Sequence, residues 1–491
     1  MKPVNESLER FGVSTEQLRA LVAEGMKSGG DWCDLFFEDT SYSELVLRDG
    51  EVNAGGSHID YGCGVRVLKG EKTGYAYAES TEPKALLAAA RAASAIGSNS
   101  KSLNVSKLHE NYRRNSAIVN KQNPDYQHFD SAATFYEMQQ DWRNAQSAQF
   151  VPVLKRLDAI IRAKDARVHK VIAMLSYSVS EILMYNSLDE LTADTRPLGS
   201  ITVTTIFMQD GKTEMTSASR SFRQGAELIT DALLEEIAES AVKGMDERFE
   251  ARRPKGGKMP VVMAAGASGI LLHEAMGHAF EADFVRKGQS IFTGRLGKQV
   301  ACKGINILDD ATIPGNRGSI NYDDEGVPGQ KTYMVQDGIL TSFLHDRISA
   351  AWFGVAPTGN GRRESFRYNP IPRMRCTYME NGSDGSVGDI IADVKKGIFV
   401  EEFSNGEVKI GEGDFTFYVK SGHLIENGRL TMPVKDINIV GNGPKALADI
   451  VAVAADLKID NGTWTCGKEQ SAPVGCGIPS VLVNGLTVGG E

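Results

Sequence analysis

Short apolar segments separated by glycine-containing pairs recur along the chain and restrict it to folds rich in antiparallel sheet. Glycine adopts the positive φ angles that tight hairpin turns require, so these pairs predict β-hairpins. The chain holds 51 glycines against 16 prolines, which also favours many turns. The pairs are Asp49-Gly50, Lys69-Gly70, Asp337-Gly338, Asn381-Gly382, Asn405-Gly406 and Asn427-Gly428.

Helices are expected beside these strands. Ser14 precedes apolar residues at helical spacing, which predicts a helix from about residue 15. Further helices are predicted at about Pro83–Ile96, within 130–165 and at about Gly225–Val242. Short strands are predicted at 34–38, 44–47, 61–68 and 74–78, and long extended segments at 168–185 and 200–222. The order indicates an α+β fold.

A change of composition divides the chain in two. The run 248–258 is rich in Arg, Lys, Pro and Gly, as is typical of a linker. We therefore predict an N-terminal domain at 1–252, an antiparallel sheet with flanking helices. The C-terminal domain, 253–491, should be mostly antiparallel β and should carry the helix described next.

Charge and composition exclude several classes of function. The chain has 54 basic and 63 acidic residues and a net charge of −9, which gives no general attraction for nucleic acids or anionic membranes. The first ten residues contain no apolar signal segment, and no apolar run approaches 18 residues. The six cysteines are too scattered for a disulfide scaffold. We expect a cytoplasmic protein with reduced thiols.

The most specific motif is His273-Glu274-Ala275-Met276-Gly277-His278, which follows an apolar strand and a glycine-rich turn. Two neutral imidazoles can bind Zn²⁺, and an adjacent carboxylate can take a proton from a zinc-bound water. His273 and His278 are therefore candidate metal ligands, and Glu274 is the candidate general base.

The spacing of the two histidines requires a distorted helix. Residues five apart point about 140° away from each other on a regular α-helix. We therefore expect a π-type turn or a bend near Gly277, where glycine makes the deformation inexpensive. The alternative is a regular amphipathic helix with one buried, hydrogen-bonded histidine and one exposed.

A catalytic zinc needs a third protein ligand, and the residues alone leave its identity open. Cys466 and Cys476 lie beside glycines in segments expected to be turns, where a thiolate could face a cleft. The alternative for any single cysteine is a small buried apolar residue. The other eligible ligands are Glu281, Asp283, His345, His423 and the remaining four cysteines.

Arginines gather in the segment 357–375, where Arg362, Arg363, Arg367, Arg373 and Arg375 alternate with aromatic residues and prolines. Such a segment could bind phosphates and stack on bases. In an acidic chain without a nucleic-acid-binding module, a solvated or substrate-contacting loop is the favoured interpretation.

Several motifs together resemble the TldD branch of the TldD/PmbA metalloproteases. These motifs lie in the predicted second domain and nearly span it, whereas over the first domain the resemblance is one of layout, with 124–148 as an apparent insertion. They are HEAMGHAFEADF at 273–284, DDEGVPGQ at 323–330, PTGNGRRESFRYNPIPRMRCTY at 357–378, GEGDFTFYV at 411–419, TCGKEQSAPVGCG at 465–477 and the closing LTVGG.

The resemblance implies a zinc peptidase whose metal is held by His273, His278 and Cys466, with Glu274 as the catalytic glutamate. It implies a two-fold dimer, either a homodimer or a heterodimer with a metal-free PmbA (TldE) subunit, enclosing a cavity that admits unfolded peptides. Cys476 departs from the family, which more often has an apolar residue there. Family members have also been called modulators of DNA gyrase, but the acidic charge of this chain does not support direct DNA binding.

Two functions follow as expectations. The preferred one is a zinc-dependent peptidase acting on flexible peptides or small unfolded proteins. The alternative is a non-catalytic peptide-binding or regulatory subunit with a structural metal or none. A closed four-ligand site would indicate a structural metal, and three ligands with an open position would indicate catalysis.

Overall fold

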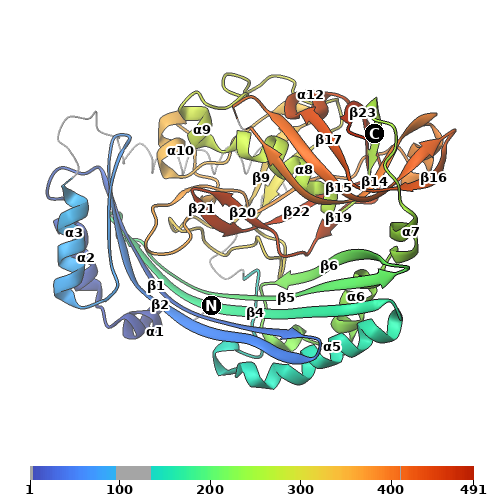
Figure 1. The fold of residues 1–491 in the computed structure, drawn as a ribbon. Coiled ribbons are helices and arrows are strands. Elements are labelled where there is room, and N and C mark those ends of the chain that lie inside the picture. Colours follow the sequence, from blue (N-terminus) through green and yellow to red (C-terminus); the bar gives the residue numbers. More distant parts are fainter. Residues whose placement is uncertain (1–3, 96–133, 410, 491) are drawn as a thin grey trace.

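A six-stranded antiparallel sheet with the order β3-β2-β1-β4-β5-β6 forms the N-terminal half. The computed structural model describes residues 4–95, 134–409 and 411–490. Four of the strands are 17 to 19 residues long, and they curve beneath the C-terminal half (Figure 1). The strands are β1 Trp32–Arg48, β2 Glu51–Lys69, β3 Lys72–Ala78, β4 Val168–Asn186, β5 Leu191–Gln209 and β6 Lys212–Phe222.

The strands are longer than the apolar runs predict. The runs 34–38 and 44–47 are parts of one strand, β1, because backbone pairing with β2 and β4 continues through the polar residues between them. Thr40, for example, lies opposite Asp60 and Ser180, and its hydroxyl group is hydrogen-bonded to the Ser180 hydroxyl at 2.8 Å. The predicted segment 200–222 is likewise not one strand but parts of the β5–β6 hairpin.

Five helices cover the face of this sheet that is turned away from the C-terminal half (Figure 1). One group, at 4–26 and 83–94, packs over one end of the long strands, and the other, at 151–164 and 231–242, packs over the opposite end, so each end of the sheet has its own apolar cluster. Ser14 caps α2 as predicted, with its hydroxyl accepting from the Gln17 N–H. The helices are α1 Val4–Phe11, α2 Thr15–Met26, α3 Pro83–Ser94, α5 Val151–Lys164 and α6 Asp231–Val242.

The predicted helix at 130–165 is only partly present. In the described part, from residue 134, two short 3₁₀ turns at Trp142–Asn144 and Ser147–Phe150 precede α5. Trp142 is buried and its Nε1–H donates to the Gln224 carbonyl at 2.7 Å, which ties this stretch to the sheet. Residues 96–133, which include part of the apparent insertion, lie outside the described residues.

The C-terminal half contains two larger sheets. One has the order β10-β9-β8-β13-β22-β19, and the other has the order β14-β7-β23-β17-β15-β16 with β18 beside β23. The second sheet closes on itself, because β14 also pairs with β15. Only the β7–β14 and β13–β22 pairs are parallel among the described strand pairings, so the mostly antiparallel α+β fold is confirmed.

The strands of this half are β7 Gly257–Met263, β8 Ile307–Asp310, β9 Lys331–Gln336, β10 Ile339–Leu340, β13 Cys376–Met379, β14 Lys396–Val408, β15 Asp414–Glu426, β16 Arg429–Val434, β17 Ile437–Asn442, β18 Ile450–Val453, β19 Lys458–Asp460, β22 Gly475–Ile478 and β23 Val481–Val488. Two small hairpins pair β11 Gly361–Arg362 with β12 Ile371–Pro372 and β20 Thr465–Lys468 with β21 Gln470–Pro473. The helices are short: α9 Ala282–Arg286, α10 Arg347–Phe353, α11 Val387–Ala392 and α12 Gly443–Ala448.

Two of the predicted C-terminal turns are confirmed and two are wrong. Asp337-Gly338 joins β9 to β10, and Asn427-Gly428 joins β15 to β16. Asn381-Gly382 follows β13 but leads toward α11, and Asn405-Gly406 lies inside β14. Gly406 is required there for packing, because a Cβ atom at this position would meet the Phe417 ring at 2.2 Å.

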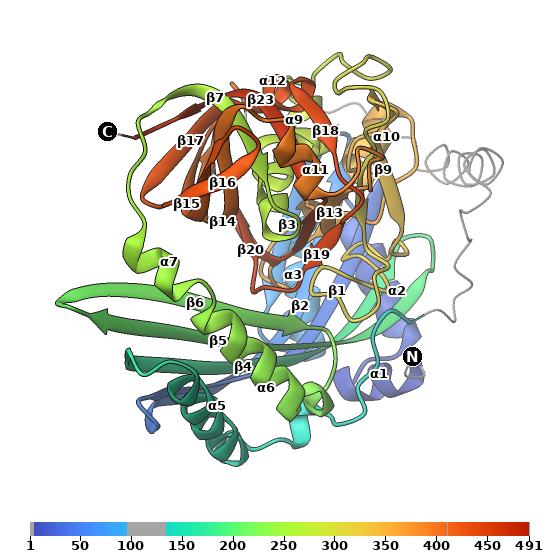
Figure 2. The same ribbon diagram turned by 90° about the vertical axis from the view of Figure 1, so that its right-hand side faces the viewer.

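The two halves are joined through α7 Met245–Glu250, which follows α6 and leads to β7 (Figure 2). This helix extends into the predicted linker. Beyond it, the Arg252 N–H donates to the Pro433 carbonyl at 3.1 Å, and Lys435 Nζ donates to the Arg248 carbonyl at 3.0 Å. The segment that connects the two halves is therefore hydrogen-bonded to the closed sheet. The domain boundary at 252/253 stays a prediction.

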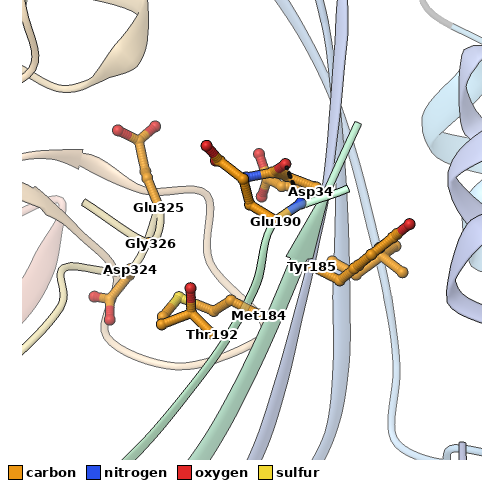
Figure 3. A pocket seen from close by; sticks show the side chains of 10 residues that line it. Asp34, Met184, Tyr185, Glu190, Thr192, Asp324, Glu325 and Gly326 are labelled. Atoms are coloured by element: carbon orange, nitrogen blue, oxygen red, sulfur yellow. Dashed lines mark hydrogen bonds between the residues drawn. The ribbon is translucent and has the colours of Figure 1, made fainter. Parts of the chain in front are cut away.

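A buried ion network fills part of the contact between the halves. Arg66 of β2 lies 2.6 Å from Asp34 of β1 and 2.6 Å from Glu325, which belongs to the segment 323–330. Burial opposes ionisation of Asp34, but Arg66 and Arg363 outweigh it and lower the pKa of this carboxyl group. Asp34, Glu190, Asp324 and Glu325 surround a cavity of about 10 Å³ (Figure 3). Only about one water molecule fits there, so the cavity is not a substrate site.

None of the described helices combines the length and the apolar character needed to cross a membrane.

Candidate metal centre

The helix that carries the sequence motif is widened, as the spacing of its histidines predicts. After β7, a 3₁₀ turn at Ala267–Gly269 leads into one helical turn, α8 Ile270–Leu272, and then into a π-helix at His273–Gly277. The His278 N–H donates to the His273 carbonyl, five residues back, which is the hydrogen bond of a π-helix. The two imidazole centroids lie 5.2 Å apart. The predicted deformation is confirmed.

Gly277 is needed for a different reason from the one predicted. Its φ of −56° and ψ of −47° are ordinary helical values, so the π-turn does not use the conformational freedom of glycine. A Cβ atom at Gly277 would instead lie 2.1 Å from the Met374 sulfur. Met374 is fully buried and packs directly onto the helix at this position. Close packing therefore requires the glycine.

Cys466 of β20 completes a cluster with the two histidines. Its Sγ atom lies 3.2 Å from His278 Nε2, and one ligand atom from each of His273, His278 and Cys466 lies within 4.8 Å of the other two. All three residues are buried, which contradicts the alternative of one buried and one exposed histidine. In the described part of the chain, neither ring nitrogen of His273 has a hydrogen-bond partner. An unpartnered buried imidazole beside a thiol fits a zinc ion.

The electrostatics of the cluster favour a bound cation. Burial would raise the pKa of the Cys466 thiol, but His273 and His278 outweigh it and lower this pKa to about 4. The thiolate, which is the form that binds metals, therefore predominates at neutral pH. Burial would also lower the pKa of His278, but Glu281 and the Cys466 thiolate raise it to about 10. The site thus attracts positive charge, from a proton or from a metal ion.

Glu274 lies next to this cluster without belonging to it. Its Oε2 atom is 3.9 Å from His278 Nε2, and 23% of its side chain is exposed, whereas 5% of the His278 side chain is. Glu274 is not one of the three residues whose ligand atoms converge. A partly exposed carboxylate at this distance can exchange protons with a water molecule held at the cluster.

Glu281 and Lys468 support the metal-binding residues, a role that the sequence analysis missed. Glu281 Oε2 accepts a hydrogen bond from His278 Nδ1 at 3.0 Å, which leaves Nε2 free to face Cys466. Lys468 Nζ lies 2.9 Å from Glu281 and 2.8 Å from Asp283. Glu281 and Asp283, both weighed as third ligands, thus form an ion cluster behind His278. One sequence signal could have indicated the role of Lys468: side chains two residues apart on a strand share a face, so Lys468 lies on the same face of β20 as Cys466.

The remaining candidate ligands lie elsewhere. His345 packs against Phe343 and Phe353, and burial lowers its pKa to about 3. His423 lies in a different group, with Glu247 and Glu401. Cys476 is buried on β22, and burial raises the pKa of its thiol well above the usual range. Cys466 and Cys476 both lie in strands, so the prediction that they occupy turns is wrong.

The sequence predicts a solvated or substrate-contacting loop for the arginine-rich segment, and the structure contradicts the solvated form. Four of its five arginines, Arg362, Arg363, Arg373 and Arg375, are buried. Their guanidinium groups donate hydrogen bonds to backbone carbonyl oxygens in the protein interior. Arg373, for example, donates to the Cys466 carbonyl at 2.7 Å and to the Gln470 carbonyl at 2.6 Å. It therefore fixes the β20–β21 hairpin that carries Cys466.

Comparison with protein-family models matches most of the chain. Residues 33–97 match PmbA/TldA metallopeptidase domain 1, residues 141–245 match the central domain, and residues 256–490 match the C-terminal domain. All three residues of the cluster lie in the last of these matches.

Solved structures show the same fold. A protein from Thermotoga maritima, described as a modulator of DNA gyrase, superposes with a TM-score of 0.72 at 23% identity and covers 97% of this chain and 100% of its own. TldE from Thermococcus kodakarensis superposes with a TM-score of 0.70 at 18% identity, over 96% of this chain and 100% of its own.

Relatives named as proteases match in sequence. The metalloprotease TldD homolog of Haemophilus influenzae is 37% identical, covering 99% of this chain and 98% of that protein. The zinc metalloprotease TldD homolog of Saccharolobus solfataricus is 33% identical, covering 52% of this chain and 57% of that protein. On the full-length match and the three domain models together, the chain belongs to the PmbA/TldD family of metallopeptidases, in its TldD branch.

Proposed function

We propose that this chain is a zinc-dependent peptidase that hydrolyses flexible peptides or small unfolded proteins. The observation that carries the proposal is the convergence of His273, His278 and Cys466 around one point, with Glu274 beside it. The Saccharolobus relative is named a zinc metalloprotease, which supports zinc as the metal.

The proposed ligands are the two imidazoles and the Cys466 thiolate. Three protein ligands leave one position open, as is typical of catalytic zinc sites. When bound, zinc supplies a Lewis acid that polarises the scissile carbonyl and lowers the pKa of a bound water. Glu274 accepts the proton of the attacking water and delivers it to the leaving amine. Glu281 keeps the His278 proton on Nδ1, so that Nε2 is available for binding.

The assembly is part of the proposal. We propose that the chain is a cytoplasmic protein that forms a two-fold dimer, with a second copy or with a PmbA/TldE-like subunit, and that peptides enter a cavity between the subunits. Residues 1–252 would form the dimerisation and cavity-wall domain, and 253–491 the metallopeptidase domain. Exposed strand edges of the second domain would hold an extended peptide through backbone hydrogen bonds, with broad sequence tolerance.

The test is Glu274→Gln, assayed for zinc content and for cleavage of an unstructured peptide. The variant should keep its zinc and lose hydrolysis by at least about 100-fold, the usual contribution of a general base. Glu412→Gln, which changes an exposed glutamate that forms an ion pair with Lys409, is the matched control and should remain active. Wild-type hydrolysis by Glu274→Gln would remove Glu274 from the mechanism. No hydrolysis by the zinc-loaded wild type, alone or with a PmbA/TldE-like subunit, would favour a non-catalytic binding subunit instead.

A further inference from the structure

A second group of potential metal ligands lies where the connecting helix meets the closed sheet. Glu247 of α7, Glu401 of β14 and His423 of β15 each place one ligand atom within 4.8 Å of the other two. His423 is only 9% exposed, and in the described part of the chain no group forms a hydrogen bond with its Nδ1 atom. This group shares no residue with the His273–His278–Cys466 cluster.

The strand geometry directs Glu401 toward His423. In the β14–β15 ladder, Val400 pairs with Gly422 and Glu402 pairs with Ser421, so Glu401 is an extra residue without a partner. Such a β-bulge re-aims a side chain, and bulges are frequent beside functional sites. The carboxylate of Glu401 lies 4.0 Å from His423 Nδ1.

The distances are close to those of a metal site. His423 Nε2 lies 3.6 Å from Glu247 Oε1, on the other side of the ring. Around a tetrahedral zinc with bonds of about 2.0–2.2 Å, neighbouring ligand atoms are about 3.4 Å apart. The Glu247 side chain is 55% exposed, so it can move to share one ring nitrogen with Glu401 without disturbing the core.

The charges around the group favour a dication. With a neutral imidazole, the two carboxylates carry two negative charges. Lys243 offsets part of this charge, and burial raises the pKa of Glu401. The neighbouring cations have other partners: Lys420 binds Glu402 at 2.7 Å, and Lys435 binds Glu214 and the Arg248 carbonyl. One imidazole and two carboxylates are donors that suit zinc.

We propose that Glu247, Glu401 and His423 form a second divalent-cation site, occupied by zinc, that fastens α7 to the β14–β15 pair. The segment 251–256 between α7 and β7 connects the N-terminal sheet to the half that carries Cys466. A metal at Glu247 therefore restrains the connection between the two halves.

Metal stoichiometry tests the site. The full-length chain is stripped with a chelator, reloaded with Zn²⁺, desalted and analysed for metal per chain. The wild type should hold two zinc ions, His423→Ala one, Cys466→Ala one, and the double variant none. His169→Ala, which removes an exposed histidine from β4, is the control and should hold two. A wild type with one zinc, or a His423→Ala variant that keeps both, would overturn the proposal.

Cobalt distinguishes loss of the site from misfolding. A Co²⁺-loaded His423→Ala variant should keep the thiolate-to-cobalt absorption band of the Cys466 centre and lose one equivalent of cobalt. Glu247→Gln changes an exposed side chain and should also lose one equivalent. Retention of both equivalents in a folded Glu247→Gln variant would show that α7 contributes no ligand.

Limited proteolysis tests the fastening. Cleavage within 251–256 should be several-fold faster in His423→Ala than in the zinc-loaded wild type. Equal rates would contradict a restraint on the connection.

Discussion

Lys468 Nζ lies 2.9 Å from Glu281 Oε2 in the protein interior, and this ion pair joins the two segments that supply the metal centre. Glu281 bonds His278, and Lys468 stands two residues after Cys466 on β20. Cys466 and His278 are 188 residues apart in the sequence. The Lys468–Glu281 ion pair therefore places the Cys466 thiolate opposite the His278 imidazole before a metal binds. Burying Lys468 costs desolvation energy, which is reduced by a second carboxylate, Asp283, and by the Phe284 ring.

Glu281→Gln should weaken zinc binding while the three ligands remain. An amide oxygen is a weaker acceptor for the His278 Nδ1–H than a carboxylate, and loss of such an outer partner typically lowers metal affinity about 10- to 100-fold. Asp283→Asn is the matched control, because Asp283 binds the same lysine but makes no described contact with His278. Competition with a fluorescent chelator measures both affinities. Equal losses would mean that Lys468, and not the bond to His278, determines the affinity.

Cys466→Ala should lose one zinc equivalent, and Cys476→Ala should lose none. The Cys466 sulfur lies 3.2 Å from His278 Nε2, whereas the Cys476 thiol is buried on β22 outside the cluster. Metal removal should also loosen the β20–β21 hairpin, measured as faster hydrogen exchange at 465–473. If only Cys476→Ala lost zinc, Cys476 and not Cys466 would be the ligand.

The widened helix and the α+β class could be predicted from the sequence, because they depend on local pattern: the spacing of the two histidines and the order of helical and extended segments. The sequence did not choose between Cys466 and the other candidate ligands without the family resemblance, because that choice depends on which distant strand packs against the helix. It also predicted that the arginines of 357–375 lie in a solvated or substrate-contacting loop, since composition cannot show that Arg373 has the Cys466 carbonyl as a buried partner. The sequence predicted two strands in place of β1, because the residues at its centre are polar, although their backbone pairing with β2 is continuous.

Gly277→Ala should disturb the metal centre through packing. The new Cβ would lie 2.1 Å from the Met374 sulfur, so either the π-turn or Met374 must move. Overpacking of this kind costs about 1–3 kcal/mol. Thermal unfolding and zinc affinity should both decrease, and a shorter side chain in Gly277→Ala/Met374→Val should recover at least part of each. No recovery in the double variant would show that glycine is required for the backbone and not for packing.

Glu38 should make the folded protein less stable as the pH rises. Its carboxyl group is buried on β1, and burial raises its pKa from 4.5 to about 7, although the Thr40 hydroxyl and the Phe366 N–H donate to it. Below pH 4.5 both the folded and the unfolded chain hold the proton, so no stability is lost. Between pH 4.5 and 7 the unfolded chain releases it first, which lowers the free energy of unfolding by at most about 3 kcal/mol.

Glu38→Gln should remove this loss. The glutamine oxygen can still accept from the Phe366 N–H, its amide nitrogen can donate to the Thr40 hydroxyl, and the side chain does not ionise. Urea unfolding of the zinc-loaded protein at pH 5 and pH 8 measures the effect as the change in the free energy of unfolding between the two values. From pH 5 to pH 8, the free energy of unfolding should decrease less, or increase more, in Glu38→Gln than in the wild type. Glu51→Gln, at an exposed position on β2, should show the same change as the wild type. Each variant lacks one glutamate carboxyl group and shares all other titrating groups, so the difference between the two variants measures the effect of burying the Glu38 carboxyl group. An identical pH dependence in both would show that the Glu38 carboxyl group is ionised in the folded protein and held by its two donors.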